Sequence, residues 1–145
     1  MASPQTIPPA SLVAVSDEAR AALGNRADVR IKGFPFNVGR EGRIGRFEKF
    51  KLEVERRLSR HPALNDLYLV EPSSDTLHIS REHFAIGYVD GQHVLVDRES
   101  ALGTIVAGTQ VGSDQRARQV ALHDGDLITV GDASSPYVFR FQIDA

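Results

Sequence analysis

Ser80, Arg81 and His83 lie close together in the sequence, directly before a segment that alternates like a β-strand. A serine near a histidine suggests a nucleophile with its base. However, this spacing at the start of a strand has no required geometry for proton transfer, and the chain contains no Gly-x-Ser-x-Gly turn. Serine hydrolysis is therefore a minor alternative.

Four side chains could in principle bind a metal ion: His78, His83, Asp124 and Asp126. The two histidines lack the spacing of a helical or zinc-finger pair, and the two aspartates flank a glycine in a run typical of a turn. The chain has no cysteine, which excludes disulfides, thiolate zinc sites and a cysteine nucleophile. We expect no catalytic residue, no metal and no cofactor.

Ser80 and Arg81 are also residue types that bind anions. A phosphate on a peptide carries about −1.5 to −2 charge, so its receptor needs a fixed guanidinium together with hydroxyl and backbone donors. Arg40 follows Gly39 at the end of a predicted strand, and Ser80 and Arg81 precede another strand. In the simpler interpretation, Arg40 is a solvated charge, Ser80 caps a strand and Arg81 pairs with a nearby carboxylate.

Short β-prone runs separated by turn residues predict an all-β sandwich over residues 28–145. Asp90-Gly91 is the strongest hairpin signal, because it joins two runs that alternate between apolar and other residues. The last strand alternates from Tyr137 to Ile143. Other predicted strands end at Gly39-Arg40 or lie near residues 104–106, 120–122 and 127–130.

Residues 1–27 are predicted to form an N-terminal arm. Its first part, residues 1–11, is expected to be mobile, because prolines and polar residues bury little apolar surface. A short helix is expected between Ser16, which caps its start, and Gly24, which stops it.

A helical insertion is predicted at about residues 43–64, inside the sandwich domain. One face of the predicted helix carries Phe47, Phe50, Val54 and Leu58, at helical spacing. Lys and Arg are concentrated in this part of the chain, although the formal net charge of the whole chain is only −2.

This balanced charge does not indicate a nucleic-acid-binding protein. The first residues lack the basic start and apolar stretch of a secretory signal, and no apolar run reaches membrane-spanning length. We therefore expect a cytoplasmic protein that binds neither nucleic acid nor a membrane.

Several groups of residues, taken in order along the chain, resemble the forkhead-associated (FHA) domain family. They are Phe36-Asn37-Val38-Gly39-Arg40, Asn65 to Leu69, Ile79-Ser80-Arg81-Glu82-His83-Phe84, Val94 to Asp97, Ser100 to Gly108 and Leu122 to Gly131. The resemblance covers most of residues 28–143. It implies an FHA-type β-sandwich of about eleven strands, of bacterial style, without enzymatic activity.

The resemblance also implies that loops at one end of the sandwich bind phosphothreonine in a partner protein, such as a Ser/Thr kinase or its substrate. Arg40 and Ser80 would then bind the phosphate oxygens, and Arg81 would support the phosphate or the peptide backbone. The His83 ring would hold the loops together, and Gly39 would permit a close approach. Further residues expected to line the loops are Ser100, Leu102, Gly103 and Thr104.

Leu102 departs from the family pattern. In the family an asparagine usually precedes the glycine that corresponds to Gly103, and its amide binds the peptide backbone. The position before that asparagine usually carries a hydroxyl group, but here it is Ala101. Losing two such hydrogen bonds, each contributing about 0.5–1.5 kcal/mol, would weaken binding without removing the phosphate contacts. We expect that binding survives with altered peptide selectivity.

The long separation between Arg40 and Ser80 is a second departure, and the helical insertion accounts for it. Arg43 and Arg46 repeat the Gly-Arg dipeptide within the inserted segment, so either is an alternative to Arg40. A second function also stays open, in which an FHA-fold scaffold or assembly subunit binds its partner through the inserted helix, without phosphate.

Overall fold

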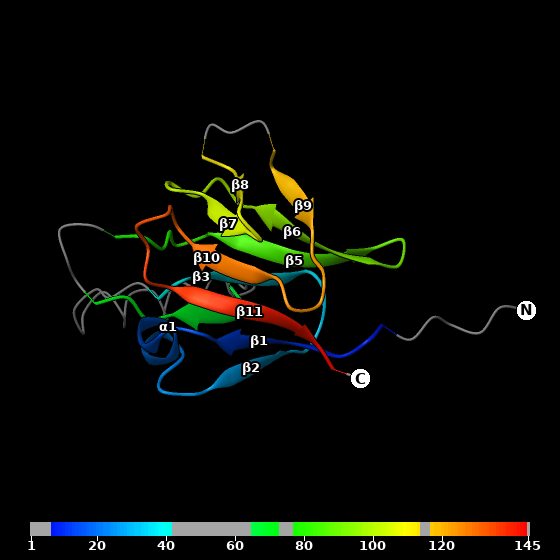
Figure 1. Cartoon of the computed structure of the whole chain (residues 1–145), viewed down its shortest axis with the longest axis horizontal. Coiled ribbons are helices and arrows are strands. Elements are labelled where there is room, and N and C mark those ends of the chain that lie inside the picture. The colour runs from blue at the N-terminus through cyan, green and yellow to red at the C-terminus, as the bar shows by residue number, and fades with distance from the viewer. Residues whose placement is uncertain (1–6, 42–64, 73–76, 114–116, 145) are drawn as a thin grey trace, which may run out of the picture.

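The computed structural model describes residues 7–41, 65–72, 77–113 and 117–144. These residues form two β-sheets with eleven strands in total, and one short helix, α1 (Asp17–Ala22). The larger sheet has the order β2-β1-β11-β10-β7-β8 (Figure 1). Its strands are β1 (Ala10–Ala14), β2 (Asp28–Ile31), β7 (Thr104–Val106), β8 (Thr109–Val111), β10 (Leu127–Val130) and β11 (Val138–Ile143).

The smaller sheet has the order β4-β3-β5-β6-β9. Within the described residues, β3 and β4 are the only parallel pair, with Arg40 opposite Leu69. The strands of this sheet are β3 (Phe36–Arg40), β4 (Leu67–Leu69), β5 (Phe84–Val89), β6 (Gln92–Asp97) and β9 (Gln119–Ala121). The all-β sandwich predicted from the sequence is confirmed.

The core consists of side chains that alternate along the strands of both sheets. Phe84 and Ile86 of β5 and Phe139 and Phe141 of β11 are almost completely inaccessible to solvent. Because successive side chains of a strand point to opposite faces, this alternation gives each sheet one apolar face that the other sheet covers. The predicted alternation of the last strand is therefore confirmed.

The hairpin between β5 and β6 also agrees with the sequence. Phe84 lies opposite Asp97 and Val89 opposite Gln92, with Asp90-Gly91 as the connection. Both connecting residues have positive φ angles, 50° and 80°. This is the backbone of the tight turns that match the twist of two paired strands, for which Asp-Gly is well suited.

Residues 10–14 differ from the sequence prediction. We expected a mobile arm through residue 11, but β1 pairs with β11 on one side and with β2 on the other. Ala10 and Leu12 are buried between the sheets, and this burial holds the strand in place. The larger sheet therefore includes residues that precede the predicted boundary at residue 28.

Helix α1 lies in the segment where the sequence predicts a short capped helix. The Ser16 hydroxyl oxygen accepts a hydrogen bond from the Ala19 backbone N–H at 3.1 Å, as an N-cap does. Ala19 and Ala22 are buried. The predicted helical insertion at about residues 43–64 lies outside the described residues.

Candidate functional site

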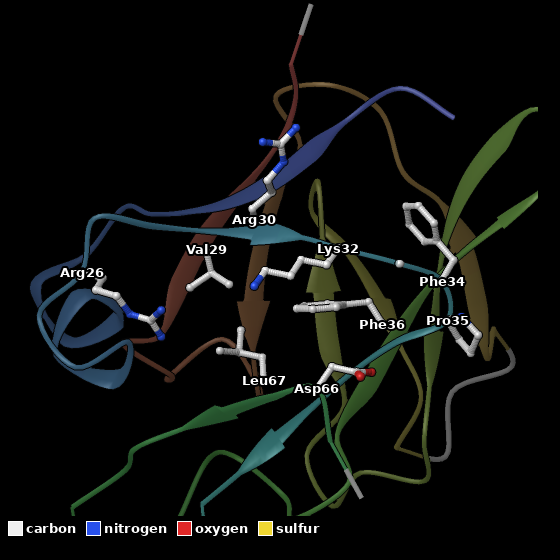
Figure 2. Close-up of a pocket in the computed structure, with 10 residues that line it drawn as sticks. Arg26, Val29, Arg30, Lys32, Phe34, Pro35, Phe36, Asp66 and Leu67 are labelled. Atoms are coloured by element: carbon white, nitrogen blue, oxygen red, sulfur yellow. The ribbon is translucent and has the colours of Figure 1, made fainter. Parts of the chain in front are cut away.

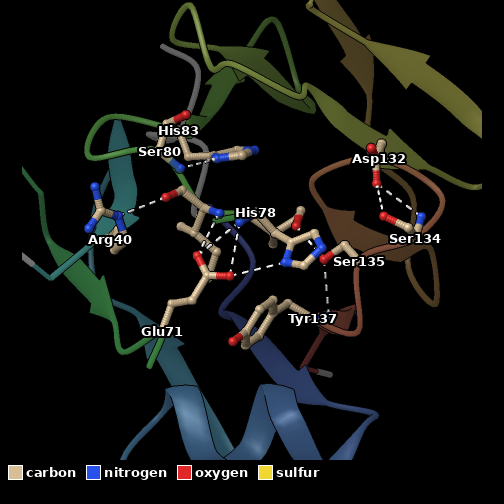
Figure 3. A network of polar contacts seen from close by, with 11 residues as sticks. Arg40, Glu71, His78, Ser80, His83, Asp132, Ser134, Ser135 and Tyr137 are labelled. Carbon is tan, nitrogen blue, oxygen red and sulfur yellow. Dashed lines mark hydrogen bonds and ion pairs between the residues drawn. The ribbon is translucent and has the colours of Figure 1, made fainter. Parts of the chain in front are cut away.

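The end of β3 meets the loop that precedes β5. The Arg40 backbone N–H donates to the Ser80 carbonyl oxygen at 2.9 Å, and Arg40 Nε donates to the Ile79 carbonyl oxygen at 2.9 Å. Two segments about forty positions apart in the sequence are thus in direct contact. Figure 3 shows the Arg40 side chain beside this loop.

Three hydrogen bonds hold Ser80 in position. Its carbonyl oxygen accepts from Arg40, its backbone N–H donates to His83 Nδ1 at 2.9 Å, and its hydroxyl oxygen accepts from the Ala101 N–H at 2.9 Å. Among the described residues no acceptor takes the hydroxyl hydrogen of Ser80, so this hydrogen can donate to a ligand. Ser80 is itself only partly buried.

The His83 ring links the loop before β5 to the loop before β7. The ring is fully buried, and Nε2 lies 2.8 Å from the Gly103 carbonyl oxygen. Because Nδ1 accepts the Ser80 N–H, Nε2 carries the proton and donates it to Gly103, which defines a neutral ring. Burial lowers the pKa of His83, although the Gly103 hydrogen bond and the Asp97 and Glu71 carboxylates act in the opposite direction.

This lowered pKa predicts a loss of stability in mild acid. The unfolded chain takes up a proton on His83 near pH 6.5, whereas the folded protein does so only at lower pH. The contribution of the neutral ring is therefore complete above about pH 6.5, and below it falls by up to about 1.4 kcal/mol per pH unit until the folded pKa is reached.

Urea unfolding between pH 8 and pH 5 measures this effect. A His83→Asn variant is expected to be less stable at neutral pH and to lose less further stability on acidification. Val89→Ala, at an exposed position without a titratable group, is the control and should keep the wild-type pH dependence. Burial also lowers the pKa of His93, whose contribution is common to all three proteins. Equal acid sensitivity of wild type and the His83 variant would contradict the assignment.

Gly39 lies where the backbone of β3 comes closest to the loop before β5. A Cβ atom on Gly39 would be 1.9 Å from the Arg81 carbonyl oxygen and 2.7 Å from Asn65 Nδ2. Real Cβ atoms do not come so close to other atoms, so the loop depends on glycine here. Asn65 is buried, and its Nδ2 donates to the same Arg81 carbonyl oxygen at 2.7 Å.

Arg98 continues this support beneath the loop. Its guanidinium donates to Asn65 Oδ1 through Nη1 and to Glu82 Oε1 through Nη2, the latter at 2.9 Å. Its backbone N–H donates to the His83 carbonyl oxygen at 2.9 Å. Asn65 and Arg98 therefore hold the backbone of residues 81–83 and leave the Arg81 side chain exposed.

Glu71 organises the other half of the same loop (Figure 3). This carboxylate is buried, and it accepts from the backbone N–H groups of His78 and Ile79 at 2.9 Å each and from His78 Nδ1 at 3.1 Å. Hydrogen bonds to an ionised acceptor are stronger than neutral ones. Glu71 therefore fixes the residues that carry the carbonyl partner of Arg40.

The loop between β6 and β7 differs in part from the expectation. Ser100 is buried, and its hydroxyl donates to Asp97 Oδ1 and accepts from the Gly103 N–H at 3.1 Å. Thr104 is fully buried as well, so neither hydroxyl faces a ligand. Gly103 is also buried, with a φ of 77°, whereas Leu102 is only half-buried. Of the four predicted lining residues, Leu102 is thus the most accessible.

The geometry also bears on the two catalytic alternatives. The group of Ser80 that contacts His83 is its backbone N–H and not its hydroxyl, so the ring cannot act as a base toward that hydroxyl in this arrangement. Both nitrogens of His83 are engaged in hydrogen bonds and cannot also coordinate a metal. Within the described residues, no group of three His, Cys, Asp or Glu side chains is placed to hold a metal ion.

Three supporting residues had no role in the sequence analysis: Glu71, Asn65 and Arg98. Each acts on a segment at least seven positions away in the chain, through a backbone group or a charged partner. Asn65 was named there only within the group Asn65 to Leu69, one of those that resemble the FHA family. No local periodicity marks such residues, because their partners are brought together by the fold.

Comparison with known proteins identifies the family. A family model for the FHA domain matches residues 43–131, which is more than half of the chain. No match was found among curated protein sequences. The chain belongs to the FHA domain family, and its two-sheet sandwich has the architecture of that fold.

Solved structures with the same fold include an Arabidopsis thaliana FHA domain and Mycobacterium tuberculosis EmbR. The FHA domain of an Arabidopsis thaliana hypothetical protein is 21% identical with a TM-score of 0.60, and the match covers 100% of this chain and 96% of that one. Mycobacterium tuberculosis EmbR, solved in complex with a low-affinity phosphopeptide, is 21% identical with a TM-score of 0.55. That match covers 95% of this chain but only 25% of EmbR.

A third similar structure comes from a study of phosphothreonine-dependent FHA domain interactions. It is 14% identical with a TM-score of 0.54, and the match covers 94% of this chain and 98% of that one. At these identities the similarity shows the fold alone. No helix in the described parts of the chain is long and apolar enough to cross a membrane.

The family match starts at residue 43, so it includes Arg43 and Arg46 but not Arg40. Arg43 and Arg46 lie outside the described residues. Arg40 is the arginine that the structure places directly against Ser80, through the backbone bond between β3 and the loop before β5. The role of Arg40 in phosphate binding stays a prediction.

Proposed function

We propose that this protein is a phosphothreonine-peptide recognition module that mediates protein–protein interaction in Ser/Thr kinase signalling. The main observation is that three hydrogen bonds fix Ser80 next to Arg40, while no acceptor in the described part of the chain takes its hydroxyl hydrogen. Two similar structures support a phosphopeptide as the ligand. One is a complex with a low-affinity phosphopeptide, and the other comes from a study of phosphothreonine-dependent FHA domain interactions. We also propose that the module prefers phosphothreonine, that a Ser/Thr kinase produces its ligand and that the protein is cytoplasmic.

Arg40 supplies the positive charge that this function needs. Its Nε is engaged by the Ile79 carbonyl oxygen, and within the described residues no carboxylate forms an ion pair with its guanidinium. The remaining N–H groups of the guanidinium can donate to two phosphate oxygens at once. Because Nε is already held, less side-chain freedom is lost when the phosphate binds.

The neighbouring groups complete the proposed receptor. The Ser80 hydroxyl donates to a phosphate oxygen, and the exposed Arg81 side chain reaches the phosphate or the peptide backbone. Leu102, half-buried in the adjacent loop, offers an apolar contact to a peptide residue near the phosphothreonine. Gly39 and His83 support the site from below without touching the ligand.

A second candidate is an FHA-fold scaffold that binds its partner without phosphate. The observation that favours it is Leu102, which cannot form the hydrogen bonds that an amide makes at this position. In this case the predicted inserted helix would provide the contact surface. The two candidates differ in a single measurable property, the dependence of binding on phosphate.

Thermal unfolding with and without peptide tests the proposal. A peptide library centred on phosphothreonine is expected to raise the unfolding midpoint by several degrees, because a ligand at about a hundred times its Kd stabilises the folded state by about 2.7 kcal/mol. The matched library with unmodified threonine should leave the midpoint unchanged. Equal shifts with the two libraries would favour the scaffold, and no shift with either would contradict the module.

A further inference from the structure

A hollow lies between the edges of the two sheets. Its volume is about 410 Å³, and it opens between β2 of the larger sheet and the first residues of β3 and β4 of the smaller sheet (Figure 2). We call it the basic groove, and its charged residues are Arg26, Arg30, Lys32 and Asp66.

The basic groove is separate from the proposed phosphate site. Phe36, which lines the groove, is the first residue of β3, whereas Arg40 is the last. At about 3.3 Å per residue, these two ends of the strand are roughly 13 Å apart. A ligand that fills the groove therefore does not need the groups around Ser80.

Cations dominate the polar part of the groove. Figure 2 shows the Lys32 amine and the Arg26 guanidinium directed into the hollow, while Arg30 points to the other side of β2. The single carboxylate, Asp66, already accepts the Asn37 backbone N–H at 2.8 Å. Among the described residues, none of the three cations forms an ion pair. The two cations that face the hollow, Lys32 and Arg26, thus outnumber its single carboxylate.

The remaining lining is apolar. Phe36 and Leu67 are core residues whose side chains form one wall, and the partly buried Val29 faces them from β2 (Figure 2). A ligand that suits this lining carries carboxylates next to apolar side chains. The lining contains no serine, threonine or histidine that could help to bind a phosphate group.

A second hollow continues the groove around the end of β2. Its volume is about 440 Å³, and it shares Arg30, Lys32 and Phe34 with the first, while its far side is formed by Ile7 and the neighbouring prolines. The two hollows together suit an extended chain better than a compact small molecule. β2 is also the last strand of its sheet, so its outer edge has backbone groups that can pair with an extended peptide.

From these observations we propose that the basic groove binds an extended, acidic, unphosphorylated polypeptide segment in which carboxylates alternate with apolar residues. The carboxylates pair with Lys32 and Arg26, and the apolar residues contact Val29 and Phe36. This interaction is independent of phosphate recognition at Arg40. A partner that carries both a phosphothreonine and such a segment would bind at two points, which raises its overall affinity.

The test uses a labelled synthetic peptide of alternating Glu and Val, titrated with the full chain and followed by fluorescence anisotropy. Lys32→Glu is expected to weaken binding about tenfold, because it replaces an attraction by a repulsion at a partly exposed site. Lys32 is exposed and forms no ion pair in the described part of the chain, so its substitution should not affect folding. Arg140→Glu, at an exposed position on β11 outside the groove, makes the same kind of charge reversal and should bind like wild type.

Several results would overturn the proposal. They are no binding by the wild type, equal binding by Lys32→Glu, or equal binding of a Lys-Val peptide, which carries the opposite charge. Loss of binding in Arg40→Ala would show that the peptide occupies the phosphate site instead. A single-stranded oligonucleotide that displaces the peptide and depends on Lys32 would assign the groove to nucleic acid.

Discussion

An Arg40→Ala variant is expected to lose about a hundredfold or more in affinity for phosphothreonine peptides. The change removes at least two charge-assisted hydrogen bonds to the phosphate, each contributing about 1.5–3 kcal/mol. Only a small part of the protein's stability should be lost, because the only side-chain bond of Arg40 among the described residues is the one to the Ile79 carbonyl oxygen. Isothermal titration with a phosphothreonine peptide and its unmodified counterpart measures the effect.

Three further substitutions make this experiment decisive. Arg140→Ala removes an exposed arginine on β11 and should bind like wild type. Arg43→Ala and Arg46→Ala address the alternative arginines within the family match. If Arg43→Ala or Arg46→Ala abolishes binding while Arg40→Ala does not, the assignment of Arg40 is wrong.

Gly39→Ala is expected to damage stability and binding together. The added Cβ would lie 1.9 Å from the Arg81 carbonyl oxygen, so β3 and the loop before β5 must move apart. This displacement breaks the close packing around Asn65 and separates Arg40 from Ser80. We expect a loss of about 3 kcal/mol in the free energy of unfolding and loss of phosphopeptide binding. Urea unfolding and titration of the remaining folded protein measure the two effects.

Gly33→Ala is the matched control for this prediction. A Cβ on Gly33 would meet no atom within 4 Å, and its φ angle is not in the positive region. Its stability should stay within about 0.5 kcal/mol of wild type, with unchanged phosphopeptide affinity. A Gly39→Ala protein that behaves like this control would refute the role given to the close approach.

The parts of the fold that were predicted correctly have local causes. Asp90-Gly91 adopts the positive φ angles that its turn requires, and the alternation from Tyr137 to Ile143 follows from one buried face. β1 was missed because it is only five residues long, because three of these residues (Ala10, Ser11 and Ala14) have small side chains, and because it follows a proline-rich stretch. Its stability comes from pairing with β11, more than a hundred positions away, which no local pattern reveals.

The same distinction applies to the candidate site. Arg40 and Ser80 were selected by residue type at strand ends and by the family pattern, and the role of His83 came from the family pattern. The structure places the backbones of Arg40 and Ser80 in contact and the ring of His83 between two loops. Ser100 and Thr104 were expected to line the site because of the resemblance to the FHA family. Both are buried instead, since the loop uses the Ser100 hydroxyl to bind its own backbone and Asp97. Sequence position alone does not show which way a side chain points.

The hydrogen bonds of Ser80 and His83 cross from the smaller sheet to the loop that leads into β7 of the larger sheet. A peptide bound by Arg40 on one side and by Leu102 on the other would link the two sheets at this end of the sandwich. It would resist sliding of one layer over the other. Amide protons of β7 and β10 would then exchange with solvent more slowly in the bound protein, although the ligand touches neither strand.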